Sequence, residues 1–273
     1  QVEVHDQAVP KAVAGQRSAV AIHGVNRQDV SRGEWLVAPG CFLATSVVDV
    51  RLRLLATCER TLEDRTRVRV HLGASETLAR VVLVEGAPLE PGEVALAQLR
   101  LEEPVVAIPG DRRVLRAYSP AVTIAGAVVL DAHATRRARL DDAARRRLHA
   151  FEHGTLAGRV ALLAAEGGGA GVRAADAALR LAVSPAAAAA AASEAKGLRL
   201  LRDGRYLTEE AWKGTLERIE NAVARYAETH KLREGIGNGE VKILLARDID
   251  GSVFDEALES LVGAKSLAFR GDR

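Results

Sequence analysis

Methionine is absent from all 273 residues, and aromatic side chains make up only 3% of them. Because translation starts at methionine, we expect Gln1 to be an internal residue of a longer protein. Hydrophobic residues still reach 48%, which is enough to form cores, and we expect valine, leucine and alanine to fill them. The length predicts roughly two domains or several small ones.

Cysteine is nearly absent too, since Cys41 and Cys58 are the only two and they do not form a CxxC pair. Neither a disulfide framework nor a zinc site is indicated, which suits a reducing cytosol and predicts a cytoplasmic location. No apolar run approaches the ~18–20 residues that a membrane span needs, so we expect no contact with a membrane. The net charge of +2 excludes a histone-like polycation but allows a local basic patch.

Motifs for catalysis are also missing. A GTPase or ATPase needs the GxxxxGK[ST] loop, whose backbone amides hold phosphate, and Gly263-Ala264-Lys265-Ser266 has a displaced lysine and no supporting glycine upstream. His149 and His153 lie four residues apart on a possible helix and could face one metal, but no third ligand is obvious, so solvated polar groups of a helix explain them better. No serine sits in a GxSxG elbow. We therefore predict no catalytic residue, no metal site and no cofactor in this chain.

The first half of the chain has the alternating pattern of half-buried antiparallel strands. In Val47–Leu55 the even-numbered positions Val48, Val50, Leu52 and Leu54 share one face. Asp49, Arg51 and Arg53 take the other face, and 66–72 repeats this pattern. Further strands are predicted at 18–23, 78–84, 94–101, 113–118 and 122–130. Many short strands separated by Pro-Gly turns indicate barrels or sandwiches.

Helices dominate after about residue 133. Predicted helices at 156–166, 172–182 and 185–192 precede a hairpin at 198–208, and three helices followed by a two-stranded wing are typical of a winged helix. The order then repeats loosely, with helices at 209–229, 240–246 and 253–262 and a short strand at 266–270. We expect two tandem winged helices, the second one truncated.

Six arginines crowd the start of this helical half. One interpretation is a solvated, flexible hinge between domains; the other is a set of RNA-backbone contacts, because arginine pairs well with phosphate oxygens. The six are Arg136, Arg137, Arg139, Arg145, Arg146 and Arg147. The third predicted helix, where a winged helix carries its recognition residues, is an alanine run that offers no hydrogen bond to a base edge. That composition argues against sequence-specific DNA recognition by the first winged helix.

Two groups of segments resemble known translation factors. The first group resembles the end of the second domain of EF-Tu-type translation factors. It consists of residues 14–20 (Ala-Gly-Gln-Arg-Ser-Ala-Val) and of the Gly24-Val25 and Asp29-Val30 pairs that follow. The second group resembles the third domain of bacterial selenocysteine-specific elongation factors, the SelB family. It consists of residues 50–55 (Val-Arg-Leu-Arg-Leu-Leu), 71–73 (His-Leu-Gly) and 96–104 (Leu-Ala-Gln-Leu-Arg-Leu-Glu-Glu-Pro). That family also carries C-terminal winged helices, which the helical half suggests independently.

The resemblance implies an architecture of EF-Tu-like antiparallel β-barrels followed by tandem winged helices. We expect the end of the second-domain barrel at 1–42, the third-domain barrel at 43–133, winged helix 1 with its basic linker at 134–207 and truncated winged helix 2 at 208–273. In the family the barrels hold selenocysteinyl-tRNA for delivery to the ribosome at UGA codons, and the last winged helix binds an mRNA hairpin. GTP and magnesium belong to a GTPase domain that this chain does not contain.

The resemblance also implies two site residues. By position, Arg17 matches the arginine that lines the aminoacyl pocket, and His5 falls at a neighbouring pocket position. A fixed guanidinium charge would favour an ionised selenol over a neutral serine side chain. Two other hypotheses stay open: a winged-helix DNA-binding regulator with a β-barrel sensor domain, and an adaptor whose barrels bind only protein.

Overall fold

The centre of the chain is a closed barrel of six antiparallel strands. The computed structural model describes residues 1–84, 86–136, 141–231, 233, 235–245 and 249–268. The barrel strands are β4 (Ala44–Leu54), β5 (Arg67–Leu72), β6 (Ser75–Leu83), β7 (Val94–Val106), β8 (Arg112–Ala117) and β9 (Thr123–Asp131). They close in the order β4-β7-β6-β5-β8-β9. All six strands were predicted within a few residues, because their inward side chains alternate with outward ones.

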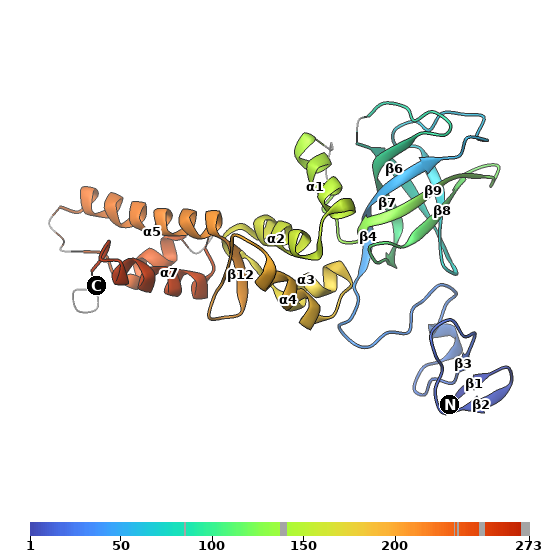
Figure 1. Cartoon of the computed structure of the whole chain (residues 1–273), viewed down its shortest axis with the longest axis horizontal. Coiled ribbons are helices and arrows are strands. Elements are labelled where there is room, and N and C mark those ends of the chain that lie inside the picture. The colour runs from blue at the N-terminus through green and yellow to red at the C-terminus, as the bar shows by residue number, and fades with distance from the viewer. Residues whose placement is uncertain (85, 137–140, 232, 234, 246–248, 269–273) are drawn as a thin grey trace.

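A small sheet precedes the barrel. Strands β1 (Val2–Val4), β2 (Gln7–Val9) and β3 (Ala19–Val20) pair in the order β2-β1-β3. The predicted strand at 18–23 shortens to the two residues of β3, which pair with Val2 and Glu3. Figure 1 shows this sheet lying apart from the barrel. At Gly33, whose φ is +99°, an added Cβ would collide with Ser75, so this segment touches the barrel there.

The helical half begins with a unit of four helices and a three-stranded sheet. Its helices are α1 (Asp142–His153), α2 (Leu156–Gly167), α3 (Ala174–Leu181) and α4 (Pro185–Glu194). Its strands are β10 (Val172–Arg173), β11 (Leu198–Leu200) and β12 (Arg205–Thr208), ordered β10-β12-β11. From α2 onward, the sequence helix, strand, helix, helix, hairpin has the order of a winged helix. The second predicted helix starts two residues late, because Val172 pairs with Tyr206 in the sheet.

Helices α5 (Glu209–Thr229), α6 (Asn238–Leu245) and α7 (Gly251–Gly263) complete the described chain. Helix α5 has the predicted bounds, and Thr208 caps it by accepting a hydrogen bond from Ala211 N. The strand predicted at 266–270 is not formed at 266–268, and the rest of it lies outside the described residues. The fold class is therefore confirmed as an antiparallel β-barrel followed by a mostly helical region with small sheets.

Three hydrophobic cores follow one another along the molecule. The first fills the barrel, and the second joins α1–α4 to Val84 and Leu130 on the outside of the barrel. The third joins α5–α7 to Leu201 and Leu207 of the β11–β12 hairpin. Because the second and third cores each include residues from the preceding unit, adjacent units are packed together and arranged in a row (Figure 1). No helix in the described part of the chain is both long and apolar enough to span a membrane.

Candidate functional site

His5 and Arg17 line the same hollow in the N-terminal sheet. His5 and Asp6 form the two-residue turn between β1 and β2, and both have positive φ (50° and 61°), as hairpin turns with the twist of their strands require. This turn brings His5 to a hollow of about 440 Å³ that Arg17 also lines. Both side chains are exposed. The two residues singled out from the sequence therefore share one site, although their role stays a prediction.

The hollow has mixed polarity. Two acidic residues, Glu3 and Asp6, line it together with the cationic Arg17. The Ser18 hydroxyl oxygen is buried there, and among the described residues it has no hydrogen-bond partner. A ligand in this hollow would be surrounded by one cationic and two acidic residues, an arrangement that would favour a group carrying both a hydrogen-bond donor and an anion over a bare anion.

The six arginines of the basic linker separate into different environments. Arg136, Arg145 and Arg146 are exposed, while Arg137 and Arg139 lie outside the described residues. Arg147 is buried at 7% exposure on the inner face of α1. Because three carboxylates already bind its guanidinium, Arg147 cannot offer that group to an RNA phosphate in this arrangement. The part of the linker from 142 onward is helix α1, not a flexible hinge, and Asp141 caps it by accepting from Ala144 N.

A further group of arginines crosses the outer face of the barrel. Arg67 lies opposite Arg80 on the neighbouring strand, and Arg80 lies opposite Arg100 on the next. Burial lowers the pKa of Arg100, and the positive charges of Arg136 and Arg65 lower it further. Glu102 neutralises Arg67 through two hydrogen bonds of 2.8 and 2.7 Å, so Arg80 and Arg100 are the directly opposed like charges. Such a pair destabilises a sheet, and this part of the face is therefore suited to an anionic partner. This group could not be predicted from the sequence, because the register that aligns the three arginines is known only from the folded sheet.

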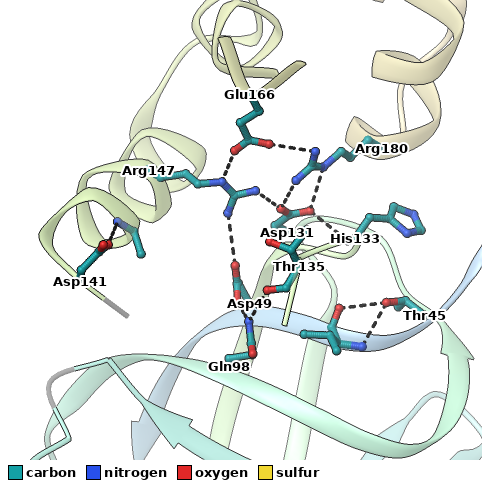
Figure 2. Close-up of polar contacts among 12 residues, drawn as sticks. Thr45, Asp49, Gln98, Asp131, His133, Thr135, Asp141, Arg147, Glu166 and Arg180 are labelled. Atoms are coloured by element: carbon teal, nitrogen blue, oxygen red, sulfur yellow. Dashed lines mark hydrogen bonds and ion pairs between the residues drawn. The ribbon is translucent and has the colours of Figure 1, made fainter. Parts of the chain in front are cut away.

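A buried polar row crosses three strands where the barrel meets the helices. Gln98 on β7 lies opposite Asp49 on β4, and Asp49 lies opposite Asp131 on β9. All three face outward from the barrel, yet none is more than 1% exposed. Gln98 Nε2 donates to Asp49 Oδ1 at 2.9 Å and to the Thr135 carbonyl at 3.2 Å (Figure 2).

Two arginines from the helices bind this row. Arg147 of α1 donates to Asp49 Oδ2 at 3.2 Å, to Asp131 Oδ2, and to Glu166 at the end of α2. Arg180 of α3 donates to Asp131 Oδ2 at 2.8 Å and forms an ion pair with Glu166 Oε2 at 2.9 Å. Figure 2 shows Arg147, Asp131, Arg180 and Glu166 as a closed ring of alternating charge, which we call the ionic ring.

The ring perturbs the pKa values of its members. Burial alone would raise the pKa of Asp131, but hydrogen bonds and positive charge from Arg180, then from Arg147, outweigh it and hold that pKa below its ordinary value. Burial likewise opposes the charge of Arg147, yet its bonds to Glu166 and Asp131 raise its pKa. Burial lowers the pKa of neighbouring His133, whose backbone N–H donates to Asp131 Oδ1 at 2.9 Å.

The lowered pKa of Asp131 predicts a loss of stability in acid. A carboxyl whose folded pKa lies below its unfolded value, about 3.9 for aspartate, stabilises the fold above that unfolded pKa. That contribution disappears as the pH falls through the folded pKa, when the carboxylate must be protonated. We expect the free energy of unfolding in urea to drop between neutral pH and pH values below about 4. Asp131→Asn should flatten this dependence, and an equally steep pH profile in that variant would contradict the assignment.

Comparison with known proteins identifies the barrel. Residues 49–136 match the family model described as the β-barrel domain of selenocysteine-specific elongation factor, SelB. A selenocysteine-specific elongation factor from Desulfomicrobium baculatum is 35% identical over 130 residues, which are 48% of this chain and 20% of that protein. The factor from Haemophilus influenzae is 26% identical over 137 residues, which are 50% of this chain and 22% of that protein. The chain thus spans about a fifth of the length of the curated relatives that it matches.

A solved structure resembles nearly the whole chain. The crystal structure of a bacterial selenocysteine-specific elongation factor, EF-Sec, superposes with a TM-score of 0.72 over 99% of this chain and 41% of that one. At 20% sequence identity, this likeness shows the fold alone. It includes the helical half, which the family model does not cover.

Proposed function

We propose that this chain, which belongs to the selenocysteine-specific elongation factor family, is the tRNA-binding and connecting part of such a factor. In this proposal residues 1–42 and 43–133 belong to two EF-Tu-like barrels that hold selenocysteinyl-tRNA. Residues 134–207 and 208–273 are winged-helix units that connect the barrels to a domain binding the selenoprotein mRNA hairpin. GTP and magnesium would bind a GTPase domain outside this chain, and delivery to the ribosome would take place in the cytoplasm.

The observation that carries the proposal is the match of residues 49–136 to the barrel of this family. The match covers most of the closed six-stranded barrel formed by strands between residues 44 and 131, which carries an arginine row on its outer face. We propose that Arg80, Arg100 and Arg136, with Arg145 and Arg146 of α1, contact RNA phosphates, because clustered guanidinium groups bind phosphate oxygens well. Arg137 and Arg139 stay in the proposed set, and Arg147 leaves it because its guanidinium is engaged in the ionic ring.

The geometry of the first winged-helix unit argues against the alternative of a DNA-binding regulator. Its wing turn is occupied, since Arg202 pairs with Glu259 of α7 and Asp203 accepts a hydrogen bond from the Ser252 hydroxyl at 2.7 Å. Helix α4, in the recognition position, is built largely of alanine. A unit with a covered wing and an apolar recognition helix lacks the groups that read base edges.

Arg17→Ala in the full-length factor tests the aminoacyl pocket. We expect binding of selenocysteinyl-tRNA to weaken about 10- to 100-fold, the loss of one charge-assisted contact of about 1.5–3 kcal/mol. Seryl-tRNA should lose less, because its side chain carries no charge for the guanidinium to bind. Equilibrium binding of both aminoacyl-tRNAs gives the two losses. Arg27→Ala is the matched control, since Arg27 is exposed in the same segment but lies outside the hollow. Equal losses for the two tRNAs would remove Arg17 from the pocket.

A further inference from the structure

The joint between the barrel and the first helical unit combines two kinds of contact. Val84 and Leu130 of the barrel are buried in the core of α1–α4, and half-buried Leu96 packs against them. Apolar burial of this kind supplies attraction but little direction, because it depends on area and not on orientation. The ionic ring lies beside this apolar patch, where its hydrogen bonds are shielded from water and depend strongly on geometry.

The ring connects separate elements on both sides of the joint. Asp131 ends β9, and through Asp49 and Gln98 the polar row continues onto β4 and β7. Arg147, Glu166 and Arg180 come from α1, α2 and α3 respectively. Both arginines bind both Asp131 and Glu166, so each planar guanidinium spans two carboxylates in a fixed fork. Turning the helices relative to the barrel would break several of these bonds at once.

A second joint follows the same design at the next boundary. Leu201 and Leu207 of the first unit are buried in the core of α5–α7. Beside them, Arg205 pairs with Asp203 at 2.9 Å and with Asp250, the N-cap of α7, at 3.0 Å. The β11–β12 hairpin is thus tied to α7 by apolar and ionic contacts together.

We propose that the ionic ring of Arg147, Asp131, Arg180 and Glu166 locks the orientation of the first helical unit on the barrel, so that the two move as one rigid body. The second joint extends this body to α7. If the proposed function holds, this rigid body keeps an RNA bound by the barrel at a fixed distance from the partner that the C-terminal helices bind. The locking itself does not depend on that function, because it is a property of the free chain.

Distance measurements by double electron–electron resonance test the lock without any RNA. Spin labels are placed at Glu103→Cys on β7 and Glu194→Cys on α4, both exposed, in a chain carrying Cys41→Ser and Cys58→Ala. We expect one narrow distance peak. Arg180→Gln opens the ring while Arg147 stays bound, and it should replace the narrow peak with a broad distribution at unchanged far-UV circular dichroism. Arg147→Gln should broaden the distribution further.

Arg51→Gln is the matched control. Arg51 on β4 pairs with Glu152 of α1 at 2.8 Å, so it also connects barrel to helix, but its side chain is 43% exposed and lies outside the ring. The peak should stay narrow in this variant. A broad distribution in the unsubstituted chain, or a narrow peak in a folded Arg180→Gln chain, would overturn the proposal. If Arg147→Gln fails to fold, the distance distribution of the Arg180→Gln chain still shows whether the ring fixes the orientation of the helical unit.

Discussion

Replacing Arg147 with methionine is expected to cost about 3–5 kcal/mol of unfolding free energy, the range for removing one partner of a buried ion pair. The side chain is 7% exposed, and its guanidinium binds Asp49, Asp131 and Glu166. Methionine has a similar length and can still pack on Phe151, over whose ring the guanidinium now lies at 4.7 Å. The loss of unfolding free energy would therefore come from carboxylates left buried without their cation, and not from a cavity. Urea unfolding followed by far-UV circular dichroism measures it.

Arg146→Met is the control for that substitution. Arg146 is the preceding residue of α1 and is exposed, so the same chemical change there should alter stability by no more than about 0.5 kcal/mol. Adding Asp131→Asn to Arg147→Met should recover part of the loss, because it removes one carboxylate that the arginine had neutralised. Similar losses for Arg146→Met and Arg147→Met, or no recovery in the double variant, would mean that the ring contributes little to stability.

The barrel was predictable from sequence because its physical signal is local. A strand with one face in a core must alternate, and β4 shows this alternation over most of its length. Asp49 was correctly placed on the face opposite the core residues, but its burial there was not predicted. Which outward positions are covered by another element is decided by tertiary packing, which alternation does not encode. The buried row of Gln98, Asp49 and Asp131 was missed for this reason.

Helix α1 was predicted only near its end, where His149 and His153 were placed on a possible helix, although the signal for the whole helix is present. Its buried residues Ala144, Arg147, Leu148 and Phe151 follow the spacing of one helix face, and Asp141 is a good N-cap. The arginines around them make the segment look like a solvated linker. An arginine in the middle of an otherwise apolar helix face is the feature that could have indicated a buried carboxylate partner.

The N-terminal site shows a different limit. That His5 and Arg17 share a hollow depends on the hairpin turn after β1 and on the pairing of β1 with β3, and this pairing brings residues distant in sequence together. The two residues were predicted from their positions in the family motif, and the folded sheet brings them together. The strand at 266–270 was predicted only by analogy with the first unit, and residues 266–268 form no strand.

Leu207→Ala is expected to cost about 2–5 kcal/mol, as for other fully buried leucines. Leu207 is on β12 of the first helical unit, yet it is fully buried in the core formed by α5–α7, with Trp212 and Phe254 in the same cluster. Its surroundings are tightly packed, since a Cβ added at Gly171 would meet its side chain, so the cavity left by alanine should not collapse easily. Unfolding is followed by Trp212 fluorescence in a Trp35→Phe background, which removes the other tryptophan.

The control lies on the same hairpin. Leu200 on β11 is 58% exposed, so Leu200→Ala should change stability by less than about 0.5 kcal/mol. If the two helical units share a core through Leu207, the fluorescence transition of α5 and the circular dichroism transition of the whole helical half should coincide and shift together in Leu207→Ala. A shift confined to the fluorescence signal would mean that α5–α7 unfold independently of the first helical unit. The rigid body would then end at the first helical unit.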